Sequence, residues 1–116
     1  MKIVTDTSII IAVLTNEKHK RKIITLTENA NLIAPTSLKW EIGNAFSCMF
    51  KRKKITLNQA RKVLLYYNEI PIRFIDIDLV PAIEIANKYN IYACDAYFIA
   101  CSQSEHAPLM TLDKEC

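Results

Sequence analysis

Four acidic residues stand where apolar runs of the chain give way to polar or helical segments: Asp6, Glu41, Asp95 and Asp113. Carboxylates gathered in one place repel one another, so such a group needs cations or protons. Hard oxygen ligands suit Mg²⁺ or Mn²⁺, and a bound ion of this kind can activate water and hold a phosphate oxygen. If the fold brings the four acids together, they predict a divalent-metal site that acts on a phosphate ester.

The elements that would position these acids alternate along the chain. Apolar runs predict short strands at 2–5, 31–34, 73–77 and 108–112. Helical spacing and capping residues predict helices near 9–14, 23–28, 38–52, 57–68, 79–89 and 95–104. This order, with strands that read as apolar runs, is typical of a parallel sheet covered by helices on both faces. Ligands bind such sheets beyond the carboxyl ends of the strands, where all four acids can lie.

Each acid also has a simpler explanation. Asp6 can cap the helix that follows it, and Asp95 stands where any acid favours a helix N-terminus. Glu41 comes four residues after Ser37, whereas a capping box requires three. Asp113 lies near the chain end and can simply be solvated. The prediction of a metal site therefore depends on the four acids lying together at the carboxyl edge of the sheet.

Composition sets broad limits. The 116 residues, 51% of them hydrophobic, suit one domain spanning 1–116 with a substantial core. The net charge of +3 permits a polyanionic partner. Basic clusters at 18–22 and 51–54 could contact the phosphates of a polyanionic partner, although a run of lysines is usually a solvated face. The sequence shows no targeting signal or spanning segment, so we expect a cytoplasmic protein.

Four motifs resemble those of the PIN domain family. Residues 5–8 (Thr-Asp-Thr-Ser), followed by an aliphatic run, look like its opening, and residues 40–44 (Trp-Glu-Ile-Gly-Asn) resemble its second motif. Residues 93–100 are similar to the third motif, in which an Asp opens an apolar helix, and residues 109–114 look like the fourth. The four motifs occur in the family's order and cover nearly the whole chain.

The resemblance implies a three-layer α/β/α fold with a central parallel sheet of about four strands. Length and motif spacing resemble VapC-like toxins of type II toxin–antitoxin pairs. That likeness implies an endoribonuclease dependent on Mg²⁺ or Mn²⁺, a homodimer and a small antitoxin protein as partner. By the same resemblance, the catalytic and metal-binding acids would be Asp6, Glu41, Asp95 and Asp113, with Ser8 and Thr111 as supporting polar residues. Asn44, one turn from Glu41, is a further supporting candidate.

The family usually continues beyond its fourth motif with a helix and often a strand. This chain ends three residues after Asp113, so we expect those elements to be missing. Other functions remain open. A PIN-like scaffold could bind RNA or protein without cutting, and the same pocket could cut DNA. Asp76 and Asp78 also match the nucleophile pattern of haloacid-dehalogenase-type phosphatases, although Asp78 as a helix cap explains the same residues.

Overall fold

Strands and helices alternate along the chain as predicted. A computed structural model describes residues 1–15 and 20–112. Its strands are β1 (Lys2–Thr5), β2 (Asn31–Pro35), β3 (Ile72–Ile75) and β4 (Leu109–Met110). Its helices are α1 (Thr7–Leu14), α2 (Lys20–Thr27), α3 (Leu38–Lys51), α4 (Leu57–Tyr67), α5 (Leu79–Tyr89) and α6 (Ala93–Glu105).

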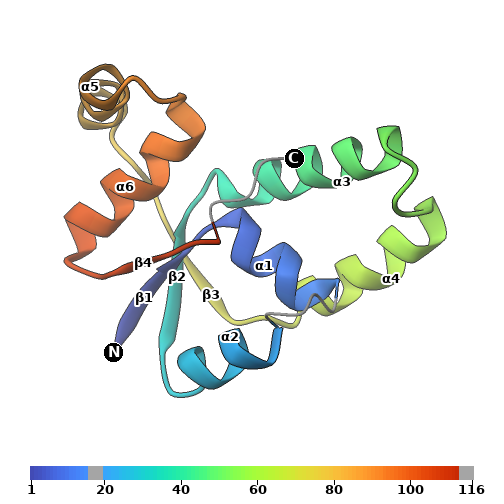
Figure 1. The fold of residues 1–116 in the computed structure, drawn as a ribbon. Coiled ribbons are helices and arrows are strands. Elements are labelled where there is room, and N and C mark those ends of the chain that lie inside the picture. The colour runs from blue at the N-terminus through green and yellow to red at the C-terminus, as the bar shows by residue number, and fades with distance from the viewer. Residues whose placement is uncertain (16–19, 113–116) are drawn as a thin grey trace.

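The four described strands form one parallel sheet in the order β3-β2-β1-β4. Helices α1 to α4 lie to one side of this sheet and α5 with α6 to the other (Figure 1). The predicted three-layer α/β/α fold is therefore confirmed. The chain adds β2 and β3 on one side of β1 and then returns to add β4 on the other. The carboxyl end of β1 is thus the point where the strand order reverses, which is where open α/β sheets bind ligands.

Burial along the strands follows their place in the sheet. The last three residues of β1 and of β2 are buried, because helices cover both faces of these central strands. Strand β3 lies at an edge and has no fully buried residue. The main core includes Val4 of β1, Ile33 of β2 and Phe46 of α3. This core fixes the helices whose N-termini surround the carboxyl edge.

Two local motifs set the ends of α3 and α4. Thr56 and Gln59 form a capping box, with Thr56 N–H donating to Gln59 Oε1 at 2.9 Å and Gln59 N–H donating to Thr56 Oγ1 at 3.2 Å. Helix α3 ends in a Schellman motif, in which Lys54 N–H donates to the carbonyl of Met49 at 2.9 Å. Lys53 occupies the left-handed position of this turn, with φ 55°.

Several boundaries differ from the sequence-based expectation. Helix α1 begins at Thr7, two residues before the expected start, with Asp6 as its N-cap. Helix α6 starts at Ala93, so Asp95 lies within its first turn and does not open it. Trp40 is hydrophobic and lies on α3, but it is 68% exposed. The buried stripe of α3 is instead Leu38, Ile42 and Phe46, which recur at four-residue spacing.

Candidate active site

The carboxylate of Asp6 is held at the end of β1 by three donors. Asp6 Oδ1 accepts from Ser8 Oγ at 2.6 Å and from Ile9 N–H at 3.2 Å, and Oδ2 accepts from the Thr111 hydroxyl. A carboxylate has about four acceptor sites, so these bonds leave one on Oδ2. Asp6 is therefore both a helix cap and an oriented carboxylate that can still take one further partner.

Ser8 connects this carboxylate to the segment that follows β4. Its Oγ accepts from Leu112 N–H at 2.9 Å, and the Thr111 Oγ1 atom lies 3.4 Å away. Ser8 thus contacts Thr111 and Leu112, which follow it in the sequence by 103 and 104 residues. The predicted supporting residues Ser8 and Thr111 thus both contact Asp6.

Three of the predicted acids line one pocket of about 440 Å³ at the carboxyl edge of the sheet. They are Asp6 after β1, Glu41 on the first turn of α3 and Asp95 on the first turn of α6. Figure 1 shows the reason, since β1 leads into α1 and β2 into α3 at the end of the sheet where α6 begins. Ser8 and Asn44 line the same pocket.

The pKa of Glu41 is raised by its surroundings in this pocket. Burial raises the pKa of its carboxyl, and the negative charge of Asp95 raises that pKa further. Hydrogen bonds with the side chains of Cys94 and Asn44 offset part of this rise. Burial also raises the pKa of the Cys94 thiol, with contributions from Glu41 and Asp95. A bound cation would relieve the repulsion between the two carboxylates.

One wall of the pocket is a stripe along α3 that ends in positive charge. The lining residues of this stripe are Glu41, Asn44, Ala45, Cys48, Met49 and Arg52. They recur at three- and four-residue spacing, which places them on one face of the helix. Lys54 also lines the pocket, after the Schellman turn that ends α3. The pocket therefore combines carboxylates with two cationic side chains.

The donor chemistry of the pocket fits a hard divalent cation. Its three acids offer only oxygen ligands, and Thr7 Oγ1 in its wall is buried with no hydrogen-bond partner. In the conformation described, no three His, Cys, Asp or Glu side chains among residues 1–15 and 20–112 form a group that could hold an ion. Burial and the negative charge of Asp95 both raise the pKa of Glu41, so a closer grouping of these carboxylates requires a cation that offsets their repulsion.

Two sequence predictions lie outside the described residues. One is Asp113, the fourth acid, and the other is the beginning of the basic cluster at 18–22, of which residues 18 and 19 are not described. Asp76 and Asp78, the two residues of the phosphatase pattern, lie within the described part of the chain but do not line this pocket. They follow the edge strand β3, and Asp78 is the N-cap of α5.

Sequence reasoning missed Cys94, and it named Arg52 and Lys54 only as members of the basic cluster at 51–54, without placing them in the pocket. Arg52 stands eleven residues after Glu41, a helical spacing that returns to the same face, so the pattern could have placed it in the pocket. Lys54 could not be placed, because it depends on a Schellman turn with lysine, rather than glycine, in the left-handed position. Cys94 hydrogen-bonds Glu41 across two helices, and no sequence signal indicates that contact.

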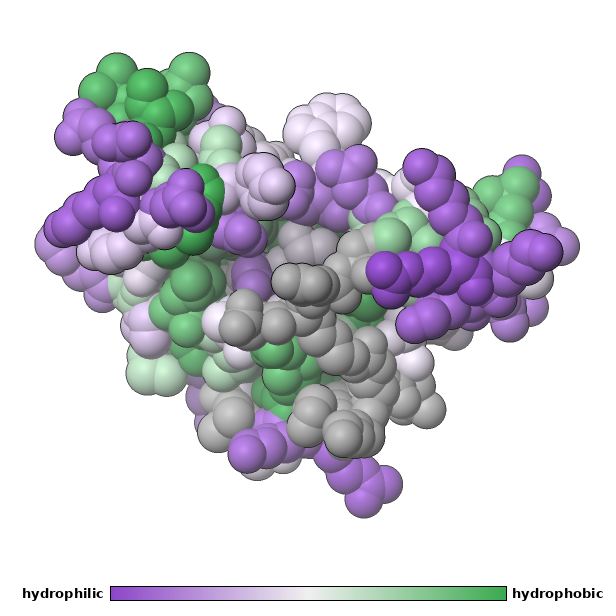
Figure 2. Space-filling view, turned by 45° about the horizontal axis from the view of Figure 1, so that its top comes forward, coloured by the Kyte–Doolittle hydropathy of each residue, from purple (hydrophilic) through white to green (hydrophobic). Residues whose placement is uncertain are grey.

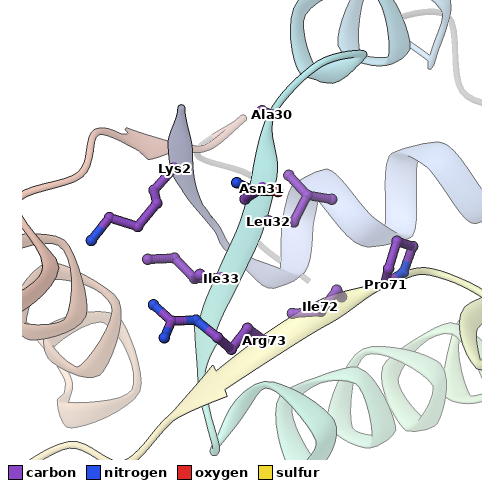
Figure 3. A pocket seen from close by; sticks show the side chains of 8 residues that line it. All are labelled: Lys2, Ala30, Asn31, Leu32, Ile33, Pro71, Ile72 and Arg73. Atoms are coloured by element: carbon purple, nitrogen blue, oxygen red, sulfur yellow. The ribbon is translucent and has the colours of Figure 1, made fainter.

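A second hollow, of about 530 Å³, lies at the opposite edge of the sheet between the starts of β1, β2 and β3. Figure 3 shows the Lys2 and Arg73 side chains pointing to the same side of the sheet. Both pair with Glu105 of α6, at 3.6 Å and 2.9 Å. These exposed ion pairs connect the two strands to α6 and supply no nucleophile or acidic cluster.

Fold and pocket together define a doubly wound α/β protein with an acid-lined pocket at the carboxyl edge of its sheet. The model of the PIN domain family matches residues 3–116, and the chain belongs to that family. PIN domains are generally nucleases that act on nucleic acids and typically use divalent metals. The phosphatase interpretation has no support from this family.

Among solved structures, the chain is similar to the crystal structure of PAE2754 from Pyrobaculum aerophilum. The TM-score is 0.74 at 18% sequence identity, and the match covers 98% of this chain and 76% of the other. This likeness shows a shared fold. No protein of curated function matches the sequence. No helix in the described part of the chain is long and apolar enough to cross a membrane.

Proposed function

We propose that this protein is a metal-dependent endoribonuclease that cuts RNA in the pocket lined by Asp6, Glu41 and Asp95. The single observation that carries the proposal is that these acids come from β1, α3 and α6 and still line one pocket. Acids at a helix N-terminus are common as caps. Three that converge from distant segments, in a family of nucleases, are better explained by a shared chemical role.

In this proposal Asp6, Glu41 and Asp95 hold Mg²⁺ or Mn²⁺, and Asp113 is the fourth acid of the set. A bound ion of this type lowers the pKa of a water molecule and stabilises charge on a phosphoryl oxygen. Ser8 and Thr111 keep the carboxylate of Asp6 oriented through their hydrogen bonds. Asn44 restrains Glu41, so that its carboxylate remains directed to the pocket.

Arg52 and Lys54 bind the phosphate backbone of the substrate at the far end of the α3 wall. Without cations an acidic pocket repels a nucleic acid, so positive charge beside it aids binding. Figure 2 shows hydrophilic side chains gathered on the right of the molecule, over the end of α3 and over α4. Lys51, Lys53, Arg61 and Lys62 of this region are exposed. A phosphate backbone can therefore approach the pocket from this side.

The biological role we propose is that of a VapC-like toxin of a type II toxin–antitoxin pair. The motif order and spacing support it. The proposal includes a cytoplasmic homodimer and a small antitoxin protein that blocks the pocket. An adjacent small reading frame encoding a DNA-binding N-terminal segment would support this role.

A second candidate is a PIN-like scaffold that binds RNA or protein without cutting. The observation in its favour is that no three described side chains form a ready metal-binding group. If it is correct, the protein binds RNA but leaves it intact with every divalent metal tested.

Cleavage assays decide between these functions. We expect the wild-type chain to cut single-stranded RNA in Mg²⁺ or Mn²⁺ and to be inactive in EDTA, with single-stranded DNA as the parallel substrate. Asp6→Asn and Asp95→Asn should lose cleavage by at least about 100-fold, the scale of losing a catalytic charge. Asparagine is as good an N-cap as aspartate, so Asp6→Asn keeps the α1 cap.

The matched control is Asp78→Asn, which changes an N-cap after β3 that does not line the pocket. We expect this variant to cut RNA at the wild-type rate. If Asp78→Asn abolishes activity while Asp6→Asn and Asp95→Asn retain it, the proposed site is wrong. Cleavage of DNA in preference to RNA would contradict the proposed substrate.

A further inference from the structure

Two aromatic side chains beside the acidic pocket are exposed to an unusual degree. Tyr92 is 82% exposed and Trp40 is 68% exposed. Trp40 directly precedes Glu41 on α3, and Tyr92 is the N-cap of α6, three residues before Asp95. Large aromatic side chains are highly buried on average. Both residues therefore leave a stacking face in solvent at the same edge of the sheet as the acids.

A hollow of about 290 Å³ adjoins Trp40. Its lining residues are Pro35, Thr36, Ser37, Trp40, Ile77, Leu79 and Tyr97. The hollow shares both helices of the acidic pocket, because Trp40 is next to Glu41 and Tyr97 is two residues from Asp95. Ligand pockets range over about 300–1,000 Å³, so a hollow at the low end suits a single planar ring system.

Positive charge accompanies this aromatic surface. The ammonium of Lys39 lies 4.6 Å from the centroid of the Trp40 ring. On the same helix, Arg52 lines the acidic pocket. Aromatic faces combined with cations that follow a phosphate backbone are the means by which proteins bind single-stranded nucleic acid. From Trp40 to Arg52, α3 advances by about 18 Å, at 1.5 Å per residue.

We propose that Trp40 is a stacking platform for one unpaired base of the RNA, seated in the hollow between α3 and α6. The base would belong to a nucleotide next to the scissile phosphate, while Arg52 binds the backbone on the other side of the acids. This inference rests on the proposed function for its ligand. It adds that the substrate must present an unpaired base, because a base within a duplex has no free face to stack.

The competing occupant of the hollow is a second copy of the chain. Leu79 and Val80 at the start of α5 are exposed, and hydrophobic side chains gather over α5 at the upper left of Figure 2. The lysine on the Trp40 ring favours RNA, because its ammonium can pair with a phosphate, whereas the core of a protein–protein interface is depleted of charged residues. The test below separates the two occupants.

Trp40 is the only tryptophan of the chain, so its fluorescence reports directly on the hollow. We would titrate the Asp6→Asn protein, which cannot cut, with a short mixed-sequence single-stranded oligoribonucleotide and with the same strand in a duplex. We expect the single strand to quench the tryptophan emission. The duplex should cause little change.

Binding of end-labelled RNA, followed by fluorescence anisotropy, measures the contribution of the ring. Stacking on one aromatic side chain corresponds to about 5- to 150-fold in affinity, so Trp40→Ala should weaken binding by that factor. Trp40→Phe should retain most of the affinity. The matched control is Tyr89→Ala, which removes a 54% exposed aromatic side chain from the C-terminal end of α5 and should bind as the parent does.

The inference is overturned if Trp40→Ala binds single-stranded RNA as tightly as the parent protein. It is also overturned if tryptophan emission depends on protein concentration and not on RNA, which would assign the hollow to a second copy. Failure of cleavage is a separate result, measured on the wild-type chain with Mg²⁺ or Mn²⁺. Stacking without cleavage would keep this inference and reject the nuclease.

Discussion

Removing the hydroxyl of Ser8 should destabilise the protein, although this side chain is small and only partly buried. Ser8 Oγ donates to the carboxylate of Asp6 at 2.6 Å and accepts from Leu112 N–H at 2.9 Å. A hydrogen bond to a charged group contributes about 1.5–3 kcal/mol and a neutral one about 0.5–1.5 kcal/mol. The two together set an upper limit of about 4.5 kcal/mol.

Two effects reduce that limit. Water can replace part of both bonds, because they are only partly buried. Alanine is also a better helix former than serine, by about 0.5 kcal/mol. We therefore expect Ser8→Ala to lower the free energy of unfolding by about 1–3 kcal/mol, measured by urea denaturation. Cleavage should fall as well, because Asp6 loses one of the donors that orient it.

The matched control is Ser104→Ala on α6. Ser104 Oγ donates only to the carbonyl of Cys101 within its own helix, at 3.2 Å. Such a bond adds little to helix stability, so this variant should be as stable as the wild type or slightly more so. If Ser8→Ala and Ser104→Ala have the same unfolding free energy, Ser8 does not connect β1 to the segment after β4 in the way described.

Three further predictions follow from single residues. Lys53→Gly should raise the free energy of unfolding by about 1 kcal/mol in urea denaturation, because glycine has no Cβ atom to clash in the left-handed position of the Schellman turn. A loss of stability would contradict this description of the turn. Arg52→Gln should raise KM for RNA and lower the slope of log K against log salt by about 1, whereas Lys88→Gln on α5 should leave both unchanged. Cys101 is fully buried and burial raises its pKa to about 11, so the thiol is protonated at pH 8. Iodoacetamide should then modify Cys101 only after unfolding, as checked by peptide mass spectrometry, and rapid native labelling would refute its burial.

The sequence predicts the fold well where local rules and burial agree. The strand of residues 2–5 and the start of the helix at residue 57 are confirmed, because apolar run length and the capping residues Thr56 and Gln59 are local signals. The parallel sheet follows from the alternation of strands and helices. The meeting of Asp6, Glu41 and Asp95 at one edge follows from that topology, since all three come just beyond the carboxyl edge.

What sequence reasoning missed depends on tertiary contacts. The exposure of Trp40 could not be predicted, because the buried face of α3 carries Leu38 and Ile42, and hydrophobicity alone does not show which apolar residues of the helix are buried. The start of α6 was expected at Asp95, because an acid is a good cap. The helix begins at Ala93 instead, with Tyr92 as an N-cap that makes no side-chain hydrogen bond.

Calorimetric titration with Mn²⁺ tests the account most directly, because its central claim is that acids from three distant segments bind the same cation. We expect Asp6→Asn, Glu41→Gln and Asp95→Asn each to weaken Mn²⁺ binding by at least about 10-fold, since even outer-shell partners of a metal contribute that much. Asp78→Asn should bind Mn²⁺ as the wild type does. If the wild type binds no Mn²⁺, or if all four variants bind it equally well, the three acids do not form a metal site.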